Sequence, residues 1–518
     1  MKNRLPLVLA LLLTLLFAAA NLWVIYHKGS YLLTLVPLGL LVVWLFVQRL
    51  ETGLLCMALL TPFAVNMALM PGMELSMPVE PMMILFTLIF FFRILALRKF
   101  GVRNSEFGVS GSDSINSELR TPNSELLRHP VTLLLLASLA WMFITSCTSR
   151  LPWVSFKYLL ARIWFVVPFF FAAALIFNDR RRIRQFYWAY AIGLAAVILI
   201  ATSKTLGNFS DLQTLHRVMR PFYNDHTAYG CAIALMLPAA VYFGLTPIPS
   251  PLRRGEQNAV LTNGSRSPLP CGEGLWARLL RFIFIGLLLI GLFFSYCRAA
   301  WLSVLAAVGV YVMIRLGLKV KWMVLLFGLG VGVFFVYQSD VLYKLSKNHQ
   351  DSSYDLAGQI KSISNISTDA SNLERLNRWA SAMRMWKESP VLGIGPGTYQ
   401  FIYGSYQKSY QLSTISTNAG DNGNAHSEYI GPMTEQGLPG VLLVAALFLT
   451  TFATGVRVYR TASDRDVGRM ALAFTLSLLT YYVHGVFNNF LDTDKLSVPF
   501  WAFTAAIVAL DVKLKIEN

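Results

Sequence analysis

The residues of this 518-residue chain that could do chemistry are mostly basic. Arg375 and Arg378 lie three apart in a segment with helical spacing, so both side chains project from the same side of the expected helix. Arg298 stands at a tight turn between two apolar runs, where an ionisable residue is a functional candidate. Guanidinium groups bind phosphate oxygens through paired hydrogen bonds. This set of arginines therefore predicts a phosphate-binding site.

Two further arginines, a histidine and a glutamate extend the set. Arg217 and Arg220 stand in the loop before Pro-Phe-Tyr-Asn-Asp-His. His426 lies in Asn-Ala-His-Ser-Glu-Tyr just before an apolar run, and Glu435 follows in Glu-Gln-Gly-Leu-Pro-Gly. A histidine near arginines, with its near-neutral pKa, is a candidate general base. The alternatives are that His426 is structural, and that the arginines form a solvated face or a helix on the membrane surface.

The elements that must position these residues are membrane helices. The chain is 55% hydrophobic and only 14% charged, with a mean hydropathy of +0.53. This composition excludes a water-soluble domain, because soluble proteins carry about 25% charged residues. The net charge of +17 sits in short loops between apolar runs, so nucleic-acid binding is not expected. The five cysteines show no C-x-x-C spacing, which argues against a disulfide or zinc site.

The apolar runs predict an all-α polytopic membrane protein with about 14 transmembrane helices. The predicted spans lie near 5–25, 31–47, 53–70, 81–97, 130–146, 154–177, 186–204, 225–244, 279–296, 300–316, 322–338, 437–455, 470–488 and 497–512. A signal peptide is the alternative for the first span, because three alanines at 18–20 could form a cleavage site.

Loop charge predicts the orientation. The segments expected on the cytoplasmic side hold 27 Lys and Arg residues, against 7 in the six short outer loops. By the positive-inside rule, both termini are cytoplasmic and the long loop 339–427 is periplasmic. Two cytoplasmic loops, 101–127 with its repeated Asn-Ser-Glu and 246–274 rich in Pro, Gly and Ser, have the composition of flexible linkers.

The long outer loop contains its own structural signals. Ser371, followed three residues later by Glu374, predicts a helix start, and Pro390 ends that helix. The segment Gly393–Gly397 is a very weak match to a nucleotide-binding loop, since no Lys-Ser/Thr pair follows it. We interpret it as a turn that returns the loop to the membrane.

The order of these motifs resembles the O-antigen ligase and polymerase superfamily, which includes O-linked oligosaccharyltransferases. The resemblance rests on Arg298 with Ala-Ala-Trp-Leu, Arg375 and Arg378 with the Pro-Val-Leu-Gly-Ile-Gly-Pro-Gly turn, His426, and Glu435-x-Gly-Leu-x-Gly. It implies a helical fold related to class C glycosyltransferases. It also implies three regions: helices 1–7 with the insert 101–127 in 1–214, a catalytic region at 215–455 including loop 339–427, and C-terminal helices in 456–518.

The resemblance implies transfer of a glycan from a polyprenyl diphosphate to an acceptor hydroxyl, at the periplasmic face of a bacterial inner membrane. The acceptor would be lipid A core, a growing glycan or a protein, with membrane lipids as further partners and with no cofactor or metal. Arg298 and His426 are the expected catalytic residues, Arg217, Arg220, Arg375 and Arg378 the diphosphate ligands, and Glu435 a supporting residue.

Three features qualify this resemblance. Ser427 follows His426 where many members have Asn. The first outer loop, 26–30, has no carboxylate, which argues against a metal-dependent sugar transferase. The acidic pair Asp492 and Asp494 is expected in a solvated loop. A solute or inorganic-carbon transporter is the alternative function, although carriers place their substrates near the midplane, and a scaffold in a polysaccharide assembly complex stays open.

Overall fold

The chain folds into a mostly helical bundle, seen in a computed structural model. The structure describes residues 5–29, 32–70, 73–100, 124–207, 217–245, 275–323, 325, 329, 370–412, 416–417 and 423–517. Most of the insert 101–127, the linker 246–274 and the first part of loop 339–427 lie outside the described residues.

Seven segments within the described part are long and apolar enough to cross a membrane. Six of them are α7 (Pro130–Cys147), α10 (Arg180–Leu206), α12 (His226–Leu245), α15 (Arg298–Arg315), α20 (Ile430–Thr461) and most of α22 (Asp494–Glu517). The seventh, Pro152–Ile176, consists of α8 (Pro152–Val166), a π-helical stretch (Val167–Ala172) and α9 (Ala173–Ile176). The polytopic prediction agrees with this architecture.

Helices also lie at the other predicted spans, except the eleventh near 322–338, which is mostly outside the described residues. They are α1 (Leu5–Lys28), α2 (Val36–Gln48), α3 (Leu50–Leu60), α4 (Val79–Phe100), α14 (Leu275–Phe294) and α21 (Arg465–His484). The number that crosses the membrane stays a prediction. α2 and α3 are short, at about 20 Å and 16 Å if each residue rises about 1.5 Å.

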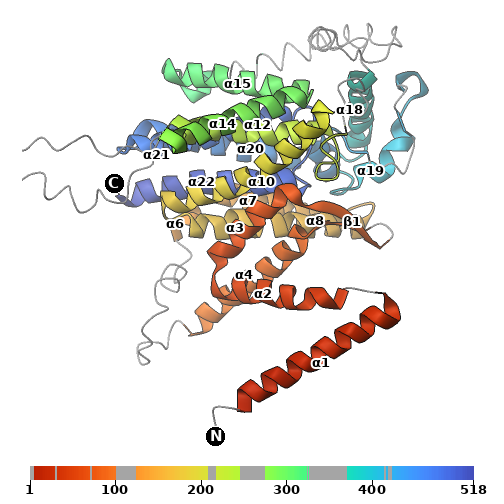
Figure 1. The fold of residues 1–518 in the computed structure, drawn as a ribbon. Helices are drawn as coiled ribbons and strands as arrows, with labels where there is room; N and C mark the ends of the chain where they lie inside the picture. The colour runs from red at the N-terminus through yellow and green to blue at the C-terminus, as the bar shows by residue number, and fades with distance from the viewer. Residues whose placement is uncertain are drawn as a thin grey trace, which may run out of the picture.

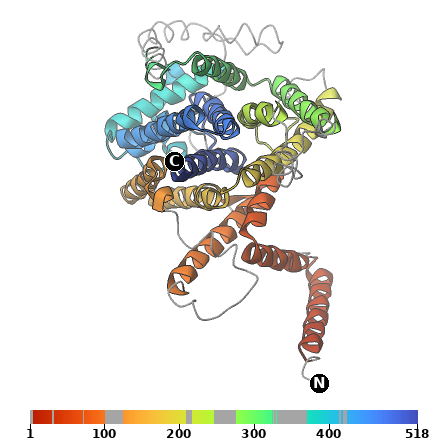
Figure 2. The same cartoon turned by 90° about the vertical axis from the view of Figure 1, so that its left-hand side faces the viewer.

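The centre of the bundle is formed by α12, α20, α21 and α22, which pack on one another (Figure 1). Most of α22 is buried, as is most of α12, so these two helices are enclosed by the others. A helix that is apolar all round belongs in such a position. α1 projects away from the bundle in both views (Figure 2).

The third predicted span, 53–70, is wrong in its second half. α3 ends at Leu60 and is followed by one 3-10 turn (Thr61–Phe63). An antiparallel hairpin comes next, with β1 (Val65–Met70) paired to β2 (Met73–Met77). Lys495 explains the ending, because its Nζ donates to the carbonyl oxygens of Thr61 and Ala64, 2.7 Å away in each case. A lysine on α22 thus satisfies backbone acceptors that a continuing helix would have paired.

The sequence predicted Asp494 in a solvated loop, and this prediction is wrong. Asp494 is buried at the start of α22, where its carboxylate accepts from Ser76 Oγ at 2.8 Å and lies 3.2 Å from Lys495 Nζ. Asp492 is exposed. The buried pair joins the hairpin to α22. The hairpin lies at the same end of the bundle as α18 (Ala370–Glu388) and α19 (Tyr399–Ile402) in Figure 1.

Candidate active site

The helix that carries two of the predicted arginines, α18, is fixed by an internal ion pair. Arg378 Nε lies 2.7 Å from Glu374 Oε1, one helical turn away, and both side chains are buried. The Glu374 carboxylate also accepts from Ser416 Oγ. Removing either partner of such a pair would leave the other charge buried without a counter-charge, which is strongly destabilising.

Arg378 also holds the returning loop against α18. Its Nη1 donates to the carbonyl oxygen of Asn424 at 3.2 Å, and its guanidinium lies 4.9 Å from the ring centre of Tyr403. A Cβ at Gly423 would come within 1.8 Å of Nη1, so a larger residue there would displace the guanidinium from its present place. Arg378 therefore fixes the segment that leads into His426.

Arg375 reaches a different part of the molecule. Its side chain is half-buried, and its Nε donates to the carbonyl oxygen of Phe487 at 3.3 Å. Phe487 belongs to the loop 485–493 between α21 and α22. One face of α18 thus binds the returning loop through Arg378 and the α21–α22 loop through Arg375.

His426 lies beside both arginines in a left-handed backbone conformation, with φ of 48°. Its N–H donates to Asn424 Oδ1 at 3.1 Å, a local turn that suits this conformation. Burial and, to a smaller extent, the positive charges of Arg375 and Arg378 together lower the pKa of His426 to about 3. The imidazole is therefore neutral at physiological pH and able to accept a proton.

The start of α12 and the α14–α15 turn complete the group. Asp225 caps α12 by accepting from the N–H groups of Thr227 and Ala228 at 2.7 and 2.8 Å, and its charge acts on His426 against the arginines. Cys297 Sγ lies 4.0 Å from the carbonyl oxygen of Thr227. Burial raises the pKa of Cys297 to about 11, and the charge of Arg375 opposes this rise. Arg298, which begins α15, directly follows Cys297, whose thiol pKa is affected by the charge of Arg375.

Glu428 anchors the histidine loop, and sequence reasoning missed it. Its Oε1 accepts from Tyr481 OH at 2.5 Å and from the N–H groups of Phe490 and Leu491 at 2.9 and 3.0 Å. Its own N–H donates to the carbonyl oxygen of Gly485 at 2.7 Å. The loop between α21 and α22 is therefore bound from two sides, by Glu428 and by Arg375.

Ser427, the departure from the superfamily pattern, has a structural role here. Its side chain is buried, and its Oγ accepts from the N–H groups of Tyr429 and Ile430 at 3.3 Å in each case. Serine is a favoured residue at a helix start, where the first N–H groups lack partners. Ser427 thus caps α20 immediately after His426.

Glu435 supports the glycine-rich turn. Its Oε1 accepts from the N–H of Tyr399 at 3.0 Å, and its carbonyl oxygen accepts from the N–H of Gly395 at 2.9 Å. α20 is broken two residues later at Gly437, where φ is 70°. Leu438 N donates to the carbonyl oxygen of Pro390 at 2.8 Å across this break. The segment 390–397 is thus a turn docked on a broken helix.

Arg217 and Arg220 lie apart from this group in the described contacts. Both are exposed; Arg220 Nε donates to the carbonyl oxygen of Asn224 at 3.3 Å, just before α12. Arg220 is thus near the start of α12, whereas none of the described contacts ties Arg217 to α18. Their predicted role in binding a diphosphate stays a prediction.

Arg162 is a second residue that the sequence reasoning set aside. It lies on α8, and its Nη1 donates to the carbonyl oxygen of Leu491 at 2.8 Å while Nη2 donates to Tyr158 OH at 2.9 Å. It binds the same loop as Glu428 and Arg375. An arginine inside a predicted span was the available signal, since such charges mark functional regions. No cluster of three or more His, Cys, Asp or Glu that could hold a metal occurs in the part of the chain that the structure describes.

A comparison with known protein families finds a match to part of the chain. Residues 283–445 match the family model described as O-antigen ligase. This region of the chain is thus similar to the O-antigen ligase family. The matched region includes Arg298, α18, His426 and Glu435, but not Arg217 or Arg220. Members of this superfamily are membrane ligases and polymerases that transfer glycans. A comparison with curated proteins finds no match.

Proposed function

We propose that the chain transfers an oligosaccharide or polysaccharide from a polyprenyl diphosphate donor to an acceptor hydroxyl, on the periplasmic face of a bacterial inner membrane. One observation carries the proposal: the neutral, half-buried His426 lies beside Arg375 and Arg378 at one end of the bundle. The match of residues 283–445 to the O-antigen ligase family supports the reaction class.

In this proposal Arg375 and Arg298 bind the donor diphosphate. Arg375 is fixed by the α21–α22 loop, and Arg298 stands at the adjoining α14–α15 turn. Arg378 contributes positive charge but acts mainly by holding the returning loop. Positive groups fixed around a leaving diphosphate stabilise the charge that develops on it, and this stabilisation usually contributes most to the rate enhancement. Arg217 and Arg220, being exposed, would meet the donor as it approaches.

His426 takes the proton of the acceptor hydroxyl as that oxygen attacks the anomeric carbon. The new bond joins the acceptor oxygen to this carbon, the bond from the carbon to the phosphate oxygen breaks, and the polyprenyl diphosphate leaves with both bonding electrons. The anomeric configuration inverts in a single displacement of this kind. A pKa near 3 makes His426 a weak base in the empty site, but the negative charge of a bound diphosphate would raise it.

Reconstitution in liposomes tests the proposal. We expect purified protein to transfer glycan from a lipid-linked donor to an acceptor, and we expect Arg375→Gln to abolish this transfer. Arg150→Gln is the matched control, because Arg150 is exposed at the same end and pairs with Glu388. Solute uptake without glycan transfer would contradict the proposal and support the transporter alternative.

A further inference from the structure

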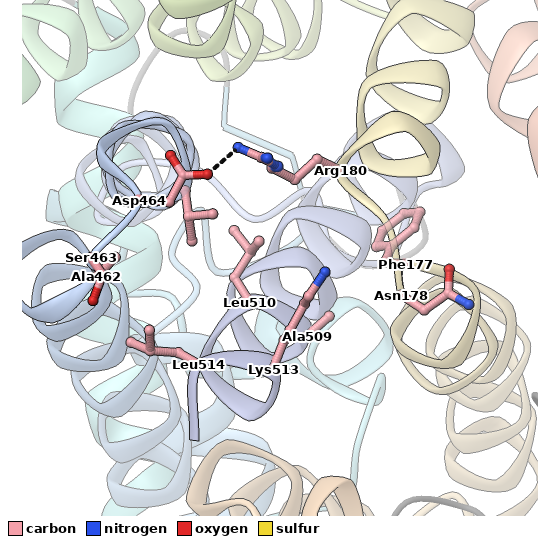
Figure 3. A pocket seen from close by; sticks show the side chains of 11 residues that line it. Phe177, Asn178, Arg180, Ala462, Ser463, Asp464, Ala509, Leu510, Lys513 and Leu514 are labelled. Atoms are coloured by element: carbon pink, nitrogen blue, oxygen red, sulfur yellow. Dashed lines mark ion pairs between the residues drawn. The ribbon is translucent and has the colours of Figure 1, made fainter. Parts of the chain in front are cut away.

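A cavity of about 290 Å³ lies at the other end of the bundle from His426. It is formed where α9 meets α10, where α20 meets α21, and along the last turns of α22 (Figure 3). Its lining includes three charged residues, Arg180, Asp464 and Lys513, and three large apolar ones, Phe177, Leu510 and Leu514. The catalytic proposal uses none of them.

Two basic side chains border this cavity. Arg180 Nη1 lies 2.8 Å from Asp464 Oδ2 and 3.2 Å from Asp466 Oδ2, and Lys513 extends toward the cavity from α22 in Figure 3. The Arg180 guanidinium carries five N–H donors in a planar fork, so it can hold the two aspartates through Nη1 and also donate to a further anion. The lining therefore has one acidic and two basic groups.

The neighbouring charges leave this positive balance unchanged, because Asp466 and Asp511 are offset by Arg457 and Lys515. Asp511 is buried next to the cavity wall, and its Oδ2 lies 2.7 Å from Arg457 and 3.2 Å from Lys515. One carboxylate therefore faces two cations. The cavity and its surroundings thus keep a small positive excess, which comes from Lys513 and favours an anion.

The remaining wall is apolar and is contributed by Phe177, Leu510 and Leu514, with smaller residues between them. A free inorganic anion would gain nothing from this surface, whereas a phosphodiester attached to an acyl glycerol would bury apolar area against it. Loop charge predicts that this end faces the cytoplasm, the side on which basic pockets between helices bind anionic headgroups.

We propose that this cavity binds the phosphodiester headgroup of an anionic phospholipid from the cytoplasmic leaflet. Arg180 and Lys513 contact the phosphate, and the apolar wall contacts the glycerol and the first carbons of an acyl chain. A lipid bound there joins the ends of α10, α21 and α22, so it stabilises the end of the bundle opposite the candidate active site. This inference is independent of the proposed reaction.

Lipid binding to the purified full-length protein, followed by native mass spectrometry, tests the proposal. We expect phosphatidylglycerol to bind more tightly than phosphatidylcholine, and Lys513→Gln to weaken phosphatidylglycerol binding about fivefold, the effect of one basic residue near an anionic headgroup. Lys319→Gln is the matched control, because Lys319 is an exposed lysine after α15, on the same predicted side, and does not line the cavity.

Three outcomes would overturn the proposal. Equal affinity for the two lipids would show that the headgroup charge is not recognised. An equal loss in Lys513→Gln and Lys319→Gln would show general attraction to the surface. Raised thermal stability with inorganic phosphate, matching that with phosphatidylglycerol, would make the cavity a free-phosphate site. Because Lys513 is exposed, its substitution leaves folding intact. The thermal stability of the Lys513→Gln variant without added lipid verifies this.

Discussion

A neutral imidazole beside two guanidinium groups gains basicity when an anion binds. In the free enzyme, burial and the charges of Arg375 and Arg378 hold the pKa of His426 near 3. The imidazole must be neutral to accept a proton, so activity falls as the pH drops through this pKa. The acid limb of kcat/KM, which reports the free enzyme, should therefore lie far below pH 6. The acid limb of kcat should lie higher, because the bound diphosphate raises the pKa. Coinciding limbs would contradict this electrostatic account.

Removing the imidazole should cost much of the rate. We expect His426→Ala to lower kcat about 10²–10⁴-fold, as for a lost general base, while binding of the donor lipid changes little. His426→Gln keeps a hydrogen-bonding side chain but cannot take the proton at neutral pH, so its kcat should be similarly low. A well-folded His426→Gln enzyme with the wild-type rate would make His426 a structural residue.

Arg298 should depend on the shape of its side chain as well as on its charge. We expect Arg298→Ala to abolish transfer with expression intact, and Arg298→Lys to recover little, because lysine lacks the planar fork that binds two phosphate oxygens. Transfer from the lipid-linked donor is the measurement. Near-normal activity in the lysine variant would reduce Arg298 to a membrane-interface anchor.

At the scale of elements, the loop from α21 to α22 sets the distance between the candidate base and the arginine. Glu428 holds it from the histidine side, and Arg375 holds it from α18. Glu428→Ala removes the acceptor for Tyr481 OH and two backbone N–H groups, so we expect kcat to fall up to about 10²-fold, as for a displacement of about 1 Å, with KM nearly constant.

Glu428→Gln keeps an acceptor oxygen at the same place and should recover most of that loss. If the glutamine variant is as slow as the alanine variant, the negative charge of Glu428 matters rather than its hydrogen bonds. The pH profile separates these roles, because a misplaced base lowers the plateau without moving the acid limb.

The position of the returning loop depends on Gly423, which has no side chain. A Cβ at Gly423 would overlap Arg378 Nη1, so Gly423→Ala should displace the contact between Arg378 and Asn424 and lower transfer at least tenfold. Gly309→Ala is the control, since a Cβ there meets nothing within 4 Å. Transfer assays on both variants, with expression matched, decide the point. Equal activity in the two would mean that the loop tolerates the shift.

At the scale of the whole molecule, the two ends of the bundle should face opposite sides of the membrane. A reporter near residue 410 should behave as periplasmic, and one near residue 184 or 462 as cytoplasmic, because basic residues concentrate in the loops on the latter side. Cytoplasmic labelling of a cysteine placed at 410 would invert the arrangement and exclude a periplasmic reaction.

The sequence was enough to predict the helical membrane class, because long apolar runs are local signals. It also singled out Arg375 and His426, which the fold brings near each other, whereas the catalytic roles of Arg298 and His426 stay predictions. The hairpin at 65–77 was not predictable, since an apolar run of that length also fits a helix. Its deciding partner, Lys495, is more than 400 residues away. Glu428 was missed for the same reason: a glutamate beside a histidine has no local pattern that indicates bonds to residues 481–491.

The short helices α2 and α3 have a consequence for the lipid around the protein. The sequence predicts that both cross the membrane, yet at about 20 Å and 16 Å they are shorter than the roughly 30 Å hydrocarbon core of a bilayer. A bilayer meets such a mismatch by thinning at the protein surface, at a cost of fractions of a kcal/mol per Å. We expect acyl chain length to matter on this flank, so that vesicles of shorter-chain lipids hold the protein with less deformation. Membrane thickness would then become a variable that sets how well the enzyme works.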